Sequence, residues 1–270
     1  MWLRALTGSL YVALIVAAIL LGPFTYGIIF ALLTALCLHE YCTLCRRQAS
    51  LPVNEPLSLL GGLWLFIAGW LYCSGTTGAG IYAPWLLFLL LTAVTALFSP
   101  RKDSLQTLAC TVTGQLYIAL PMSLLSGLAF HPAGERYSWQ LLLGFFIFLW
   151  ISDTFAYLSG MLLGRHKLIE RISPKKTWEG LIGGLVFTLI SGIVMGCLLP
   201  EVLSPAAWAG FALTTAVAGV LGDLFESLFK RTLEVKDSGS ILPGHGGILD
   251  RLDSCLFAAP AGLIYLLLLS

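Results

Sequence analysis

The sequence predicts an all-α protein, a polytopic integral membrane bundle of about nine transmembrane helices. Three observations favour this fold class. The chain of 270 residues is 58% hydrophobic and only 11% charged, which is more apolar material in long runs than a soluble core of this length can bury. Its apolar runs match the roughly 20 helical residues that span a bilayer. Each run must be helical, because a lone strand would leave backbone groups without hydrogen bonds in lipid.

Short polar breaks divide the chain into nine apolar segments, and we expect each to be a membrane span with boundaries good to about four residues. The segments lie near 3–21, 24–44, 57–73, 82–98, 105–130, 139–161, 177–199, 206–229 and 254–269. The first break is only Gly22 and Pro23, so the first two segments form either a tight helical hairpin or one kinked, re-entrant element. No cleavable signal peptide is evident, and the first segment is interpreted as a span.

The positions of Lys and Arg predict the orientation, because these residues mark the cytoplasmic ends of short loops. With nine spans, Arg136 is the one residue among the 15 Lys and Arg that falls on the side opposite the N-terminus. We therefore expect the N-terminus in the cytoplasm and the C-terminus outside. The net charge of +1 and the lack of basic arms argue against a nucleic-acid partner.

The seven cysteines give no disulfide framework, since their number is odd and their positions are scattered through apolar segments. We expect buried thiols. Cys42 and Cys45 have the spacing of half a zinc site, but no second pair or suitable His accompanies them, so we reject a metal centre there.

The segment at 139–161 and the loop after it carry a first group of polar residues. Asp153 stands inside an apolar stretch and must face the protein interior, because a carboxylate at mid-membrane costs about 2.5–3.5 kcal/mol. Residues 173–177, Ser-Pro-Lys-Lys-Thr, lead into the next helix, with Glu179 in its first turn. This helix start is either a phosphate cradle or an ordinary cap with flanking lysines.

Small residues on two helices predict close helix packing. Gly160 and Gly164 share one helix face, and Gly180 and Gly184 share a face of the following helix. Such spacing lets two helix backbones approach each other.

The segment at 206–229 ends in a charged stripe. Asp223, Glu226 and Lys230 are spaced i, i+3 and i+7, so they lie on one helix face at its cytoplasmic end. The stripe indicates a shared site, and an intrahelical pair between Glu226 and Lys230 is compatible with it.

The last polar block opens the final helix with Asp250 and Asp253, three residues apart. We expect Asp223 and Asp250 to emerge at the same membrane surface, because the connecting loop is short. Together they make a plausible dication site, and Mg²⁺ prefers one or two carboxylates completed by water and phosphate oxygens. The Gly-rich turn at 243–247 would bring backbone N–H groups near a polyphosphate. The basic side chains available to neutralise it are Lys230, Arg231, Lys236, His245 and Arg251.

These residues resemble the signature of the phosphatidate cytidylyltransferases, also called CDP-diacylglycerol synthases. The first matching block comprises Ser227, Lys230, Arg231, Lys236, Asp237, Gly239, Pro243, His245, Gly247, Asp250, Arg251 and Asp253. The second block comprises Asp153, Tyr157, Gly160, Gly164, Ser173, Pro174, Lys175, Lys176 and Gly180. The first 100 residues are similar only in being hydrophobic helices.

The resemblance implies a bacterial-type inner-membrane enzyme that requires Mg²⁺ and converts CTP and phosphatidate to CDP-diacylglycerol and pyrophosphate. It places the metal on Asp223 and Asp250, and helix spacing adds Asp253. It further implies N-terminal membrane helices over 1–130, catalytic helices with cytoplasmic loops over 131–270, and a possible homodimer.

Further roles follow for the remaining polar residues. We expect Lys230, Arg231, Lys236 and Arg251 to bind phosphates, with His245 as a phosphate donor or a turn-stabilising residue. Asp223, Lys230, Asp250 and Arg251 are the expected catalytic set. Ser173, Lys175 and Lys176 are candidates for the phosphatidate head group, and Asp153 either binds cytosine or organises the bundle.

Two other functions remain open. A CTP-dependent lipid kinase of the polyprenol-kinase kind would use the same metal and basic residues but transfer the γ-phosphate and leave CDP. A transporter of anionic solutes would also carry intramembrane acids, although here the polar residues gather at one surface.

Overall fold

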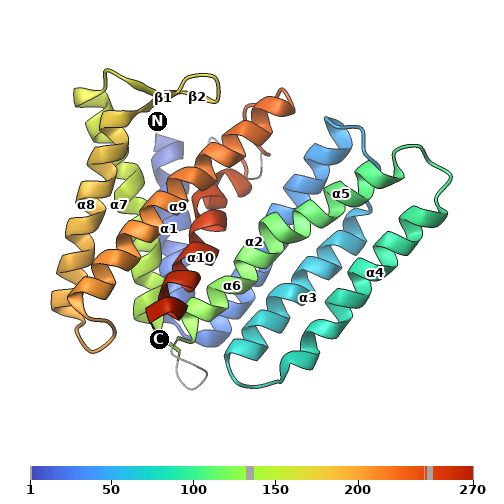
Figure 1. The fold of residues 1–270 in the computed structure, drawn as a ribbon, viewed down its shortest axis with the longest axis horizontal. Helices are drawn as coiled ribbons and strands as arrows, with labels where there is room; N and C mark the ends of the chain where they lie inside the picture. Colours follow the sequence, from blue (N-terminus) through green and yellow to red (C-terminus); the bar gives the residue numbers. More distant parts are fainter. Residues whose placement is uncertain (1, 132–136, 240, 242–245, 270) are drawn as a thin grey trace. The chain divides into compact units, whose positions relative to one another are not determined.

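The computed structural model describes residues 2–131, 137–239, 241 and 246–269 (Figure 1). Its elements, in chain order, are α1 (Trp2–Leu20), α2 (Pro23–Arg47), α3 (Glu55–Cys73), the 3-10 turn η1 (Ala79–Tyr82), α4 (Ala83–Phe98), α5 (Ser104–Gly114), the π-helical η2 (Gln115–Ala119), α6 (Leu120–Ala129), α7 (Trp139–Leu163), β1 (Lys167–Ile169), β2 (Ser173–Thr177), α8 (Trp178–Leu198), α9 (Pro205–Thr232) and α10 (Leu249–Leu269).

The predicted class, a polytopic helical membrane protein, is confirmed. Among the described residues, eight helical stretches are long and apolar enough to cross a membrane, and the apolar part of α1, Thr7–Leu20, is a shorter ninth helix. The segments η1 with α4, and α5 with η2 and α6, each count as one stretch. The main difference from the expected boundaries is α10, which begins at Leu249 and not near residue 254. The N–H groups of Ile248 and Leu249 at the start of this helix have no partner within it, and the Glu40 carboxylate accepts both of them.

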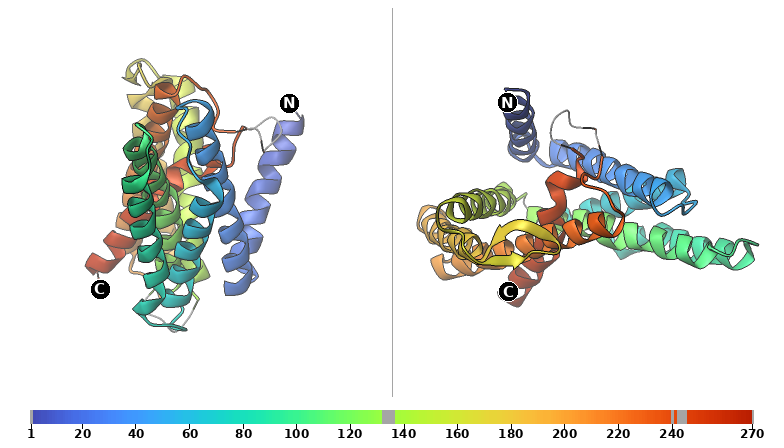
Figure 2. Two further views of the ribbon diagram at one scale, coloured as in Figure 1. Left: turned by 90° about the vertical axis from the view of Figure 1, so that its right-hand side faces the viewer. Right: turned by 90° about the horizontal axis from the view of Figure 1, so that it is seen from above.

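The first break forms a helical hairpin, as one of the two sequence interpretations predicted. α1 ends at Leu20, and Gly22 takes a φ of 114°, a conformation that residues with a Cβ rarely adopt. Pro23 then starts α2 at a position where its missing N–H costs no hydrogen bond. Figure 2 shows α1 and α2 joined at one end as two separate helices.

The chain divides into two compact units, which are described separately below. The first unit consists of Met1–Tyr137 with Leu233–Arg251, and the second of Ser138–Thr232 with Leu252–Ser270. The predicted functional division into 1–130 and 131–270 stays a prediction.

In the first unit, a buried amide joins the helices that surround it. Gln115, with no exposed surface, donates from Nε2 to the Ser58 carbonyl of α3 at 2.9 Å. Its Oε1 accepts the indole N–H of Trp85, on α4, at 3.2 Å. Hydrogen bonds of this kind link helices in an apolar solvent, where hydrophobic attraction between helices is weak.

In the second unit, aromatic side chains fill the contact between α7 and α9. Phe148 of α7 packs edge-on against Trp208 and Phe211 of α9, with ring centroids 5.9 and 6.0 Å apart. All three side chains are fully buried. The indole N–H of Trp208 donates to the Leu199 carbonyl at 3.2 Å, so its polar atom is satisfied inside the core.

The small residues expected to mediate close packing lie between α7 and α8. A Cβ on Gly184 would come 2.8 Å from the Ser152 carbonyl oxygen, and one on Gly180 would come 2.7 Å from that of Ala156. Gly160 faces the Gly180 backbone from α7. Gly160, Gly180 and Gly184 therefore contribute to tight packing in this unit, whereas Gly164 lies just beyond the end of α7, against Thr177.

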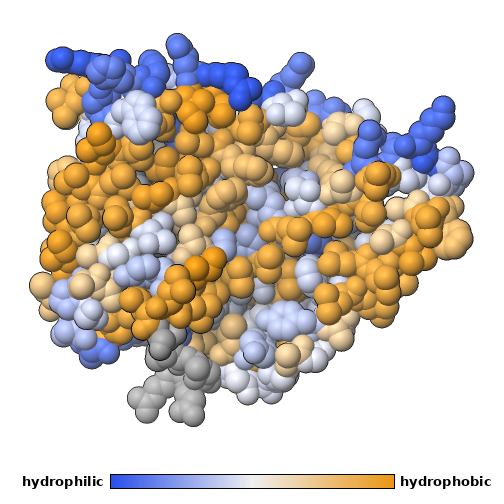
Figure 3. All heavy atoms as spheres, viewed as in Figure 1, coloured by the Kyte–Doolittle hydropathy of each residue, from blue (hydrophilic) through white to orange (hydrophobic). Residues whose placement is uncertain are grey.

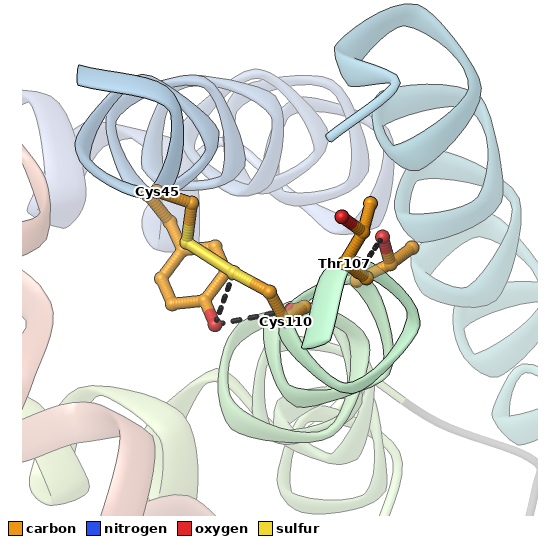
Figure 4. Close-up of a disulfide and its surroundings, with 5 residues drawn as sticks. Cys45, Thr107 and Cys110 are labelled. Carbon is orange, nitrogen blue, oxygen red and sulfur yellow. Dashed lines mark hydrogen bonds between the residues drawn. A yellow bond between two sulfur atoms is a disulfide. The ribbon is translucent and has the colours of Figure 1, made fainter. Parts of the chain in front are cut away.

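One expectation about the cysteines was wrong. Cys45 of α2 and Cys110 of α5 are joined in a disulfide, so the cysteines are not all free thiols (Figure 4). The Tyr41 hydroxyl donates to the Cys110 carbonyl beside it at 3.0 Å. The pairing spans 65 residues and depends on how α2 meets α5, which the spacing of cysteines along the sequence does not encode.

The outward faces of the helices suit lipid. Exposed Ile182, Val186 and Ile190 cover one side of α8, and Leu86, Leu90 and Leu97 cover one side of α4. Figure 3 shows these apolar faces, with hydrophilic residues gathered at helix ends.

Candidate active site

The second unit contains a cavity of about 340 Å³ that is lined by both charged and apolar residues. The charged groups are the carboxylates of Asp153 and Asp223 and the ammonium groups of Lys175 and Lys176. The apolar lining includes Tyr157, Met161, Leu168, Leu181 and Val220. A volume of this size lies at the lower end of the range for small-molecule sites.

The loop between α7 and α8 supplies the two lysines, and the start of α8 has the ordinary cap that was one of the two alternatives left open. Residues Ser173–Thr177 form β2, which pairs antiparallel with β1. Lys175 and Lys176 line the cavity, whereas Ser173 pairs with Ile169 in the sheet and does not line it. All three head-group candidates thus lie in β2, and two of them, the lysines, line the cavity.

Two side chains tie this hairpin to the start of α8. Thr177 caps the helix by accepting the Gly180 N–H at 3.2 Å. The Glu179 carboxylate, in the first turn as expected, accepts the backbone N–H groups of Arg165 and His166 at 3.1 and 3.2 Å. Its other oxygen lies 2.6 Å from His166 Nδ1. These bonds fix the loop that presents Lys175 and Lys176.

Asp153 faces this cavity. The sequence argument required it to avoid lipid; the residue is exposed and lines the cavity. Its part in binding a nucleobase stays a prediction.

The charged stripe on α9 is present as predicted. Lys230 forms an ion pair with Glu226, which is fully buried, and the Ser227 hydroxyl donates to Asp223 Oδ1 at 3.3 Å. Asp223 Oδ2 also lies 2.6 Å from the Lys176 ammonium nitrogen. Arg231 Nε donates to the Ile172 carbonyl at 3.5 Å, which connects the end of α9 with the hairpin.

Asp253 lies within electrostatic range of Asp223, Asp153 and Lys230. Gly222 makes this approach possible, because a Cβ at that position would come 2.6 Å from the Asp253 carbonyl oxygen. The second unit therefore concentrates the carboxylates of Asp153, Asp223, Glu226 and Asp253 around the two cations Lys176 and Lys230.

The first unit holds the other part of the predicted signature. Asp250 Oδ2 accepts the backbone N–H groups of Ser238 and Gly247, at 2.9 and 2.8 Å. Asp250 thereby closes the loop that precedes α10. Lys236 and Arg251 are exposed, and His245 lies outside the described residues.

The predicted metal set is divided between the units. Asp223 and Asp253 belong to the second unit and Asp250 to the first. Within either unit, the described residues form no group of three or more metal-ligating side chains. Carboxylate oxygens are the ligand type with which a divalent cation such as Mg²⁺ is held beside water and phosphate oxygens, and the magnesium site itself stays a prediction.

Sequence reasoning missed Glu40. This residue of α2 is 2% exposed and accepts hydrogen bonds from the Ser238 hydroxyl and from the backbone of Ile248 and Leu249. The available signal was an acid inside the apolar segment 24–44, the same signal that drew attention to Asp153.

Comparisons with known proteins identify relatives of this chain. The profile of the cytidylyltransferase family matches residues 2–269. The uncharacterized protein YnbB of Escherichia coli K12 is 34% identical over 239 residues, which cover 86% of this chain and 75% of YnbB.

Two staphylococcal proteins named phosphatidate cytidylyltransferase match a shorter stretch. The protein of Staphylococcus saprophyticus is 50% identical over 117 residues, and that of Staphylococcus haemolyticus is 51% identical over 115. Each stretch covers 43% of this chain and 44% of the relative, so the match spans less than half the length of these proteins.

Proposed function

The chain belongs to the cytidylyltransferase family, and on this basis we propose that it transfers the cytidylyl group of CTP to phosphatidate, giving CDP-diacylglycerol and pyrophosphate. As a nucleotidyltransferase in a bundle of membrane helices, it is suited to a lipid acceptor. The similarity to proteins named phosphatidate cytidylyltransferase supports phosphatidate as that acceptor.

The cavity of the second unit is the observation that carries the proposal. A lysine pair, Lys175 and Lys176, stands beside two carboxylates, and Met161 and Leu181 line the same space. Phosphatidate has the matching chemistry, a doubly charged phosphate on an apolar diacylglycerol. The lysines would bind the phosphate, because ammonium groups form charge-assisted hydrogen bonds with phosphate oxygens.

The proposed reaction needs no nucleophilic side chain. A phosphatidate phosphate oxygen forms a bond to the α-phosphorus of CTP, and the bond from that phosphorus to the β-phosphate oxygen breaks, so pyrophosphate leaves. The protein contributes by holding the two reactants in line and by stabilising the charge that develops.

The cations at the helix ends would take the nucleotide phosphates. We assign Lys230, Arg231, Lys236 and Arg251 to this role. Lys230 and Arg231 close the α9 stripe in the second unit, and Lys236 and Arg251 flank the loop and first turn of α10 in the first unit. His245 is proposed as an additional donor on the sequence pattern alone.

The acids would hold magnesium. We propose Asp223 and Asp250 as carboxylate ligands, with Asp253 as a further candidate. When bound, Mg²⁺ supplies charge neutralisation for the phosphate oxygens. Lys176 already neutralises Asp223 in the structure, at 2.6 Å, so this carboxylate lies within reach of the groups that bind phosphate.

The test measures the products made by purified protein in detergent with CTP, phosphatidate and Mg²⁺. We expect CDP-diacylglycerol and pyrophosphate in equal amounts, and their loss on chelation of the metal. Asp223→Asn should lower the rate by about 100-fold or more, the scale for removing one charge-stabilising group. Glu201→Gln, an exposed acid outside the helices, is the matched control and should keep full activity.

Product identity separates the rival reactions. CDP together with a phosphorylated lipid would replace the proposal with a lipid kinase. Folded wild-type protein that yields neither product pair would overturn the proposal.

We also propose that the enzyme lies in a bacterial inner membrane with its N-terminus and active-site loops in the cytoplasm. The helical bundle and the bacterial relatives support a multi-pass membrane protein, and the distribution of Lys and Arg supports the orientation.

A further inference from the structure

We propose that Glu40 is a positioning residue of the active site: it holds the start of α10, which carries Asp250, and the loop before it in place for cytidylyl transfer. The inference deepens the proposed function and rests on it. All the contacts that support it lie within the first unit.

The Glu40 carboxylate is occupied by three donors from the other end of the chain. Oε1 accepts the Ile248 N–H at 3.0 Å, and Oε2 accepts the Leu249 N–H at 2.9 Å and the Ser238 hydroxyl at 3.1 Å. The N–H groups at the start of a helix have no partner within it. A carboxylate on α2 thus satisfies the start of α10, roughly 200 residues away in sequence, and its negative charge also suits that end of the helix.

The loop is shaped to receive this carboxylate. A Cβ on Gly239 would come 2.4 Å from Glu40 Oε1, and a Cβ on Gly247 would come 2.3 Å from Oε2. A real Cβ does not make contacts this short, so a side chain at either position would push the Glu40 carboxylate away from its present place. Gly239 and Gly247 thus leave the space in which the Glu40 carboxylate lies.

Glu40 and Asp250 take their hydrogen-bond donors from the same parts of the chain. Ser238 donates its hydroxyl to Glu40 and its backbone N–H to Asp250. The neighbouring N–H groups of Gly247 and Ile248 are divided in the same way, since the first donates to Asp250 and the second to Glu40. The two carboxylates therefore accept hydrogen bonds from the same two short segments, one at Ser238 and one at 247–248. A displacement of the segment by loss of Glu40 would move the partners that orient Asp250.

The chemistry requires an acid and not merely a polar side chain. Both oxygens of Glu40 accept N–H or O–H groups. In Glu40→Gln, the amide NH₂ would face either the Ile248 N–H or the Leu249 N–H, whichever way the amide is turned, and leave a buried donor without an acceptor. Glu40→Asp keeps two acceptors on a shorter stem and should restore part of the effect.

The experiment compares hydrogen exchange with steady-state kinetics in the full-length protein. Glu40→Gln should speed amide exchange in peptides covering 236–252 while leaving α3 peptides unchanged, and should lower kcat at least tenfold. Glu40→Asp should keep at least threefold more activity than Glu40→Gln. The matched control is Glu55→Gln, which removes an acid that pairs with His39 and Arg46 of α2 but does not touch the loop; it should retain wild-type exchange and kcat.

A second variant keeps the test sharp if Glu40→Gln folds poorly. Gly247→Ala keeps the Glu40 side chain but places a methyl group against its carboxylate. We expect the same faster amide exchange over 236–252 and the same fall in kcat. Ser238→Ala removes one of the three donors and should give a smaller change in the same direction.

Unchanged exchange in Glu40→Gln and Gly247→Ala would overturn the inference. Faster exchange with wild-type kcat would reduce Glu40 to a structural role and also overturn it. If the wild-type protein forms no CDP-lipid, cytidylyl transfer is refuted and positioning for it falls as well, while the exchange data still decide whether Glu40 holds the loop.

Discussion

Lys176 and Asp223 illustrate how single residues place charge in an apolar bundle. Their atoms Nζ and Oδ2 are 2.6 Å apart, and the side chains are 27% and 29% exposed. A pair that is partly open to solvent contributes only about 0–1 kcal/mol to stability. The main effect of the pair is therefore to hold two charges at the cavity. Its removal tests function more than folding.

Lys176→Met should lower kcat/KM for phosphatidate at least tenfold, because the cavity would lose a donor to the phosphate. The apparent unfolding midpoint in detergent should change little. Lys102→Met, at an exposed lysine of the first unit, is the control. Activity equal to that of the control would argue against Lys176 as a head-group ligand.

At the scale of elements, the contact between α7 and α8 depends on the absence of side chains. Gly184 and Gly180 lie against backbone carbonyl oxygens of α7, so a Cβ there must push the helices apart. The β1–β2 hairpin then follows directly from the end of α7 and is fixed by Glu179. Helix spacing thus determines where the cavity lysines stand.

Gly184→Ala should destabilise the second unit, because its Cβ would meet the Ser152 carbonyl oxygen at 2.8 Å. Overpacking of this kind costs about 1–3 kcal/mol, and we expect a fall of several degrees in the apparent thermal midpoint. Gly80→Ala is the matched control, since a Cβ there meets nothing within 4 Å. Equal midpoints for the two variants would contradict the close-packing interpretation.

At the scale of the whole molecule, the number of spans fixes which loops share a side of the membrane. Among the described residues, eight helical stretches meet the length and hydropathy of a span, and Thr7–Leu20 of α1 is a shorter apolar helix. With α1 as a ninth span, the two termini would lie on opposite sides, which is the orientation that the distribution of Lys and Arg predicts.

Reporter fusions test this orientation. Alkaline phosphatase fused after Glu201 should be active, because nine spans place the α8–α9 loop outside, and a fusion after Arg171 should be inactive. A fluorescent protein, which matures in the cytoplasm, should give the reverse pattern. An inverted result at both positions would show that the number of spans upstream is wrong.

The sequence was sufficient to predict the membrane helices, because the length of an apolar segment is a local property and must match the thickness of the bilayer. The Glu226–Lys230 pair, one of the interpretations left open, and the contacts of Gly160, Gly180 and Gly184 also follow from spacing within a helix. The disulfide between Cys45 and Cys110 and the role of Glu40 were missed, since both depend on which helices meet. The β1–β2 hairpin was missed because Ser-Pro-Lys-Lys has little strand propensity.

The amide of Gln115 has a consequence for how the first unit tolerates change. A helix that is apolar on every side can rotate about its own axis in lipid at little cost in free energy, so hydrophobicity alone cannot select one rotation for α3 or α4. The bonds of Gln115 to Ser58 and Trp85 favour one rotation of each helix, and the bond from the Ser123 hydroxyl to the Leu65 carbonyl adds to this for α3. Lipid-facing side chains are then free to be exchanged for one another, whereas the orientation of these helices depends on a few buried polar groups.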